Sequence, residues 1–133
     1  MMDSKRLVLE ERAMRERWGD TTKLHYLPNG LLAWKVTLHQ EGNQLLICIV
    51  YPEDYPFSPP EIICETPLPA DTPHLLEGNR LCWRSHGTDR RARNRWNPSH
   101  DTAAMCVGVA QRWFLCFLVW SSTGVWPTSR RNK

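Results

Sequence analysis

Residues 51–60 read Tyr51-Pro52-Glu53-Asp54-Tyr55-Pro56-Phe57-Ser58-Pro59-Pro60, a stretch dense in proline and aromatic residues around which the chain is organised. Each proline fixes its own φ at about −65° and lacks the backbone N–H that would donate a hydrogen bond. Neither a helix nor a central strand can therefore continue through the stretch. We therefore predict a rigid corner in the chain, with its tyrosines packed as structural residues.

A cysteine lies downstream of this corner, between two further motifs that contain proline. The chain passes Thr72-Pro73-His74 and reaches Gly78-Asn79-Arg80-Leu81-Cys82-Trp83, and then Trp96-Asn97-Pro98 precedes the longest apolar helical pattern. A stiff corner, one cysteine in a polar loop and a following buried helix together indicate a fixed platform that presents a thiol. We interpret Cys82 as the functional residue of the chain.

The segment before the corner predicts one amphipathic helix. Asp3 or Ser4 can cap a helix over residues 5–18, which Gly19-Asp20 ends. Leu7, Met14 and Trp18 recur on one face of this helix. Arg6, Glu10 and Arg17 fall on the remaining, solvated circumference.

Four strands joined by short turns are expected around the corner. Alternating or continuous apolar patterns predict strands over residues 24–27, 32–38, 45–50 and 62–65. Such an order forms an antiparallel meander. The stretch 66–97 is predicted as a long loop, followed by a buried helix over residues 100–120 that Ser99 caps. The predicted fold class is α+β, with two helices against one antiparallel sheet.

Composition is typical of one globular domain over residues 1–133. Hydrophobic residues make up 41% and charged residues 23%, and the formal charge of +3 does not by itself indicate nucleic-acid binding. The five cysteines include no Cys-x-x-Cys pair, and all except Cys82 lie in apolar runs. The N-terminus is charged, and the apolar run 113–120 is too short to span a bilayer. We expect a cytoplasmic protein that does not bind membranes.

The motifs resemble those of the ubiquitin-conjugating enzyme (UBC) family. That family carries a Tyr-Pro…Tyr-Pro-Phe-x-Pro-Pro corner, as residues 51–60 do. It then carries His-Pro-Asn, a short gap and Gly-x-Ile-Cys, where Thr72-Pro73-His74 and Asn79-Arg80-Leu81-Cys82 stand here, and a Trp-x-Pro matched by Trp96-Asn97-Pro98. The resemblance covers nearly the whole chain and implies the UBC-like fold, with a truncated C-terminus that lacks the family's last two helices.

The departures from the family pattern point to a narrower branch. His74 stands where the family has an oxyanion-supporting asparagine, and the Cys82–Trp96 gap is longer than usual. The ending, from Trp113 to Pro127, resembles a divergent bacterial branch in the anti-phage signalling operons called CBASS. There the UBC-like protein is implied to form a thioester with the C-terminus of a cyclic-oligonucleotide synthase, or of a ubiquitin-like tag. An ATP-dependent activating enzyme and a protein target are the implied partners.

The resemblance assigns roles to particular residues. Cys82 is the expected thioester nucleophile, His74 the oxyanion support and Asp101 the group that orients the attacking amine. The residues expected to contact the bound partner are Arg90, Arg91, Trp83 and Trp96. This chemistry requires no metal and no small cofactor of the protein's own.

Other interpretations stay open on the residues alone. Cys82 lies between Leu81 and Trp83, as a packed core cysteine would. His74, Cys82 and His86 form a weak zinc pattern, and the arginines of the long gap are a weak signal for RNA. The chain can also be a catalytically inactive UBC-variant interaction module.

Overall fold

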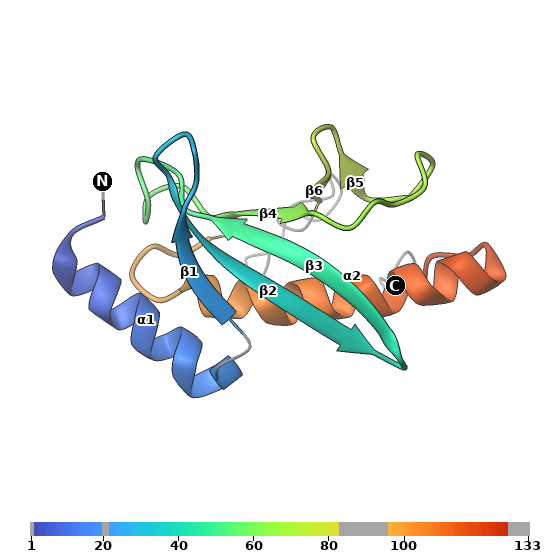
Figure 1. The fold of residues 1–133 in the computed structure, drawn as a ribbon, viewed down its shortest axis with the longest axis horizontal. Coiled ribbons are helices and arrows are strands. Elements are labelled where there is room, and N and C mark those ends of the chain that lie inside the picture. Colours follow the sequence, from blue (N-terminus) through green and yellow to red (C-terminus); the bar gives the residue numbers. More distant parts are fainter. Residues whose placement is uncertain (1, 20–21, 83–95, 128–133) are drawn as a thin grey trace.

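A computed structural model describes residues 2–19, 22–82 and 96–127 of the chain (Figure 1). Its elements follow in the order α1 (Ser4–Trp18), β1 (Thr22–Tyr26), β2 (Leu32–Gln40), β3 (Asn43–Val50), β4 (Glu61–Cys64), β5 (Leu75–Leu76), β6 (Arg80–Leu81) and α2 (Ala103–Thr123). Asp3 caps α1 by accepting a hydrogen bond from the backbone N–H of Arg6 at 2.8 Å. The predicted first helix and its cap are confirmed.

In the described part of the chain, one antiparallel sheet holds all six strands in the order β1-β2-β3-β4-β6-β5. The four-stranded meander is therefore confirmed, but the sheet continues beyond it. A short hairpin, β5–β6, lies in the stretch that the sequence predicts as loop. Each of these strands has two residues, which is too few to show the alternation that identifies a strand.

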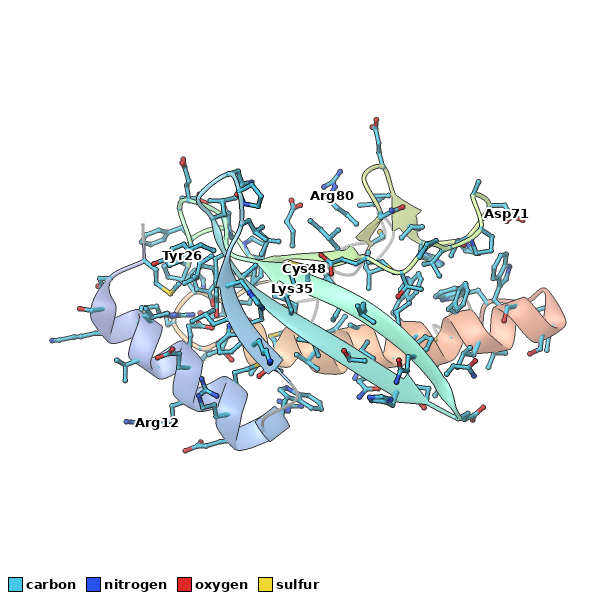
Figure 2. The ribbon with its side chains drawn as sticks, viewed as in Figure 1. Arg12, Tyr26, Lys35, Cys48, Asp71 and Arg80 are labelled. Atoms are coloured by element: carbon cyan, nitrogen blue, oxygen red, sulfur yellow. The ribbon has the colours of Figure 1, made fainter. Side chains whose placement is uncertain are left out.

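The helix α2 crosses β2 and β3 (Figure 1), and α1 and α2 both contribute side chains to the main core. The sheet's inner face carries the alternating apolar side chains of β2 and β3, such as Trp34, Leu38 and Ile47, and they share one core with Met14 and Phe114 of the helices. The opposite face carries a small second cluster of Ala33, Cys48 and Val50. Lys35 and Cys48 both lie on this opposite face (Figure 2).

The second helix begins later than its sequence predicts. It is preceded by Thr102 rather than Ser99, because residues 97–101 form a separate turn. In this turn the Asn97 carbonyl accepts from the N–H of Asp101 at 2.8 Å, and the Asp101 carboxylate accepts from the N–H of Asn97 at 2.8 Å. The Ser99 N–H donates to the Asn97 side chain at 3.0 Å, so Ser99 belongs to this turn.

The second helix is also less completely buried than expected. Its inner face is packed, but Leu115 and Val119 remain about two-fifths exposed. By length and composition alone this helix is apolar enough to cross a membrane. Since core helices of soluble proteins pass the same test, and since α2 packs on α1, β2 and β3, we assign it to the core.

Glu10 of α1 is completely buried, although the sequence pattern places it on the solvated circumference. The prediction is wrong because Glu10 lies one helical turn before Met14 and therefore shares its inward face. Its carboxylate accepts hydrogen bonds from the hydroxyls of Tyr51 and Tyr55. It also accepts from Arg6 Nε at 2.9 Å and from the backbone N–H of Ala103 at 2.9 Å.

These bonds join three distant parts of the chain. Tyr51 and Tyr55 belong to the proline corner, and Ala103 is the first residue of α2, where a negative charge is favourable. Arg6 extends the network by donating to the carbonyls of Pro98 at 2.7 Å and Asp101 at 2.6 Å. Glu10 and Arg6 therefore fix the corner and the start of α2 against the first helix.

We predict that Glu10→Ala destabilises the protein by about 3–5 kcal/mol, because it breaks an ion pair whose carboxylate is fully buried and leaves two buried phenols without their acceptor. Urea unfolding followed by circular dichroism measures this change. Glu16→Ala, on the exposed side of the same helix, is the matched control and changes the free energy of unfolding by less than about 0.5 kcal/mol. A loss below about 1 kcal/mol for Glu10→Ala would contradict the role of the network.

The buried tyrosines predict a loss of stability in alkali. Burial, followed by the nearby charge of Glu10, raises the pKa of both Tyr51 and Tyr55 far above the ordinary value of about 10. Above about pH 10, the phenols of the unfolded protein lose their protons, while those of the folded protein keep them. The unfolded state then binds fewer protons, so the free energy of unfolding falls as pH rises, by about 1.4 kcal/mol per pH unit for each tyrosine.

Urea unfolding at pH 9, 10 and 11 tests this expectation. Tyr51→Phe removes one of the two contributions and makes the fall less steep. Tyr26→Phe is the control, because Tyr26 is 74% exposed, and its slope matches the wild type. Equal slopes in all three proteins would show that the buried phenols do not cause the alkaline loss.

Candidate functional site

Cys82 follows directly after β6 and is held by the sheet. Its backbone N–H donates to the carbonyl of His74 at 3.0 Å, which closes the base of the β5–β6 hairpin. The neighbouring Leu81 is buried in the core, and β6 pairs with β4 through Ile63 and Arg80. Arg80 also forms a 3.5 Å ion pair with Glu61 of β4. The backbone that carries the thiol is therefore tied to the central part of the sheet.

The five cysteines differ in burial. Cys48, Cys64, Cys106 and Cys116 are buried, whereas Cys82 is only half-buried. Burial raises the pKa of the Cys48 and Cys64 thiols, which favours their neutral, less nucleophilic form. The prediction that four cysteines act as small core hydrophobes is confirmed, and Cys82 is the cysteine with access to solvent.

His74 is in backbone contact with Cys82 and has an unusual conformation. Its φ of 58° lies in the left-handed region, where residues other than glycine are uncommon. The turn before it is held by Thr72, which is buried and whose hydroxyl donates to the carbonyl of Pro69 at 2.6 Å. The structure thus brings the backbones of the two predicted catalytic residues together. The role of the His74 side chain in oxyanion support stays a prediction.

Two tryptophans that the sequence analysis assigns no role contact His74. The indole N–H of Trp113, on α2, donates to the His74 carbonyl at 3.2 Å. The ring of Trp126, which follows α2, lies 5.0 Å from the imidazole and 5.5 Å from the Trp113 ring, centroid to centroid. Sequence spacing does not reveal these contacts, because they join residues 39 and 52 positions apart.

The other predicted site residues have structural contacts or lie outside the described residues. Trp96 donates its indole N–H to the Pro56 carbonyl at 2.6 Å and packs near Tyr55, so it anchors the chain to the proline corner. The Asp101 carboxylate holds the turn before α2. Their roles in binding the partner and in orienting the amine stay predictions. Arg90, Arg91 and Trp83 lie outside the described residues.

Within residues 2–19, 22–82 and 96–127, no group of three or more histidine, cysteine, aspartate or glutamate side chains is arranged to hold a metal ion. The weak zinc pattern needs His86, which lies outside that part of the chain. The described residues give the zinc interpretation no support.

Comparison with solved structures places the fold among UBC-like domains. The chain is similar to a structure described as a complex of the Vps23 UEV with ubiquitin, with a TM-score of 0.54 and 15% sequence identity. The match covers 80% of this chain and 79% of that chain. At this identity the likeness shows the fold alone.

Comparison at the level of sequence families is more specific. No curated protein matches the chain. A family model described as "Type II CBASS E2 protein" matches residues 10–133, which include the proline corner, Cys82 and both tryptophans that contact His74. The chain belongs to the Type II CBASS E2 family.

Proposed function

We propose that this chain is a ubiquitin-conjugating-like acyl carrier that acts through Cys82 in the cytoplasm. It would accept the C-terminal carboxyl group of a protein as a thioester and pass it to an amine, such as a lysine, of a target. The acyl donor is a ubiquitin-like tag or a cyclic-oligonucleotide synthase. The family supports an E2-like role in CBASS anti-phage defence, and an ATP-dependent activating enzyme supplies the activated donor.

One observation carries the proposal. Among five cysteines, the one at the position of the family's catalytic cysteine is also the one that is not buried. A cysteine kept only for packing would be buried with the other four. The hydrogen bond to His74 and the pairing of β6 with β4 hold Cys82 on a rigid element, as a reactive group requires.

The chemistry needs little beyond a positioned thiol. The Cys82 thiolate attacks the carbonyl carbon of the donor thioester, a new carbon–sulfur bond forms, and the donor's own thiolate leaves. The target amine then attacks the same carbon, a carbon–nitrogen bond forms, and Cys82 leaves as a thiolate. The proton released by the amine passes to solvent. No oxidant, reductant or metal enters either step.

His74 is proposed to stabilise the oxyanion that forms during both attacks. A neutral or protonated imidazole has an N–H donor, and one such donor lowers the barrier of acyl transfer by about 3–4 kcal/mol. The support for this role is the contact of the His74 carbonyl with the N–H of Cys82 at 3.0 Å, which keeps the two residues adjacent. Asp101 is proposed to orient the incoming amine from the turn before α2.

A second function, from another class, is favoured by two observations. The solved structure that the fold matches is described as a UEV in complex with ubiquitin, that is, a domain bound to another protein. In addition, His74 stands where the UBC family pattern has an asparagine. In this alternative the chain is a non-catalytic module that binds a protein without forming a covalent bond to it.

Trapping the intermediate distinguishes the two functions. The tagged protein is purified without reductant from cells that carry the neighbouring genes, and its intact mass is measured. We expect an adduct on the wild type that reductant removes. Cys82→Ser gives an adduct that resists reductant, because an oxyester replaces the thioester, and Cys82→Ala gives none.

Cys48→Ser is the matched control, since Cys48 is buried in the small cluster on the opposite face of the sheet, and it keeps the reductant-sensitive adduct. The mass of the adduct also identifies the acyl donor. Absence of any adduct on both the wild type and Cys82→Ser would refute the carrier function and favour the binding module.

A further inference from the structure

The segment after α2 returns to the hairpin that carries Cys82. Gly124 ends the helix with a φ of 82°, a left-handed conformation that glycine adopts without strain, and its N–H donates to the Trp120 carbonyl at 2.7 Å. Apart from the adjoining backbone, the described residues place no atom within 4 Å of where a Cβ would lie at Gly124, so the conformation and not the space requires glycine. The turn sends Trp126 back toward the sheet, where only 8% of it remains exposed.

His74 is consequently held at two separate points. Trp113 binds its backbone carbonyl through the indole N–H, and Trp126 packs on its imidazole ring with an interplanar angle of 52°. Trp113 and Trp126 also contact each other. Trp113 therefore contacts the His74 backbone, Trp126 contacts the His74 ring, and the two indoles pack on each other.

We infer that Trp126 is a positioning residue that sets the orientation of the His74 imidazole for acyl transfer at Cys82. This inference rests on the proposed function and adds a residue to it. Trp126 is 44 positions from Cys82 in the sequence, and it would act through its contact with the His74 ring.

The physical reason is the rotational freedom of a histidine side chain. The backbone of His74 is fixed in the left-handed region, with a φ of 58°, but its imidazole can still turn about two side-chain bonds. An oxyanion donor is effective only when its N–H is held close to the position of the developing charge. The ring of Trp126 removes alternative orientations before the reaction begins, and an error of about 1 Å in such an arrangement can slow a reaction about 100-fold.

A double-mutant cycle tests the inference without the natural donor or activating enzyme. A synthetic peptide thioester that ends in glycine loads Cys82 by thioester exchange, and intact-mass spectrometry follows transfer of the peptide to free lysine. The variants are Trp126→Leu, which keeps apolar bulk but removes the aromatic ring, His74→Ala, and the two combined. Trp126→Phe is the conservative variant, and Trp120→Leu is the control, since Trp120 contacts Phe117 on the same helix.

We expect His74→Ala to slow transfer to lysine about 100-fold or more and Trp126→Leu to slow it about 10-fold or more. The double variant is no slower than His74→Ala, because Trp126 acts only through His74. Trp126→Phe and Trp120→Leu stay within about threefold of the wild type. We expect the rate of Cys82 alkylation by iodoacetamide to be unchanged in all variants. A general disturbance of the β5–β6 hairpin would instead change this rate.

Each failure has a separate meaning. If the wild-type protein loads no peptide or transfers none to lysine, the proposed function fails and the inference with it. If the wild type transfers but His74→Ala is not slower, His74 has no catalytic role for Trp126 to support. If both single variants are slow and their effects multiply in the double variant, or if Trp126→Leu transfers at the wild-type rate, only the inference is overturned.

Discussion

The buried carboxylate of Glu10 is the interaction on which the rest of this structure depends. A negative charge without solvent is costly unless it is paired and fully hydrogen-bonded. Glu10 meets that requirement with donors from Arg6, Tyr51, Tyr55 and the first backbone N–H of α2. Because these donors come from three distant segments, satisfying one carboxylate fixes the relative positions of the first helix, the proline corner and the second helix.

The same constraint explains how the thiol platform is assembled. The proline corner leads into β4, which pairs with β6, and Cys82 follows β6 directly. On the other side, α2 carries Trp113, whose indole binds the carbonyl of His74. The candidate site therefore lies where β6, which the proline corner positions through β4, approaches α2, whose start is fixed by Glu10. This arrangement supports the proposed carrier function, since a nucleophile that receives and releases large protein groups needs a stable geometry throughout.

Most of the architecture could be predicted from the sequence, and so could the burial of every cysteine except Cys82. Alternating apolar residues identified β2, a near-continuous apolar run identified β3, and apolar residues at helical spacing identified α2. Such patterns arise because burial selects apolar residues on the buried faces of an element. The separation of Cys82 from the four buried cysteines was also predicted correctly, from their apolar neighbours.

What the sequence did not predict depends on contacts between distant residues. Glu10 is charged and was therefore placed toward solvent, although its position one turn before Met14 was a signal of burial. The β5–β6 hairpin was missed because two-residue strands carry no period. The contacts of Trp113 and Trp126 with His74 arise only when the segment after α2 turns back, and no local pattern records that approach.

Covalent chemistry at Cys82 in anti-phage defence is the proposal on which the functional interpretation rests. The most direct measurement is the efficiency of phage plating on cells that carry the gene with its native neighbours, as wild type, Cys82→Ala or Cys48→Ala. We expect Cys82→Ala to lose protection and to plate phage like cells without the genes, while Cys48→Ala stays protected. Full protection by Cys82→Ala, at a protein level equal to the wild type, would contradict the proposal and show that the chain works by binding alone.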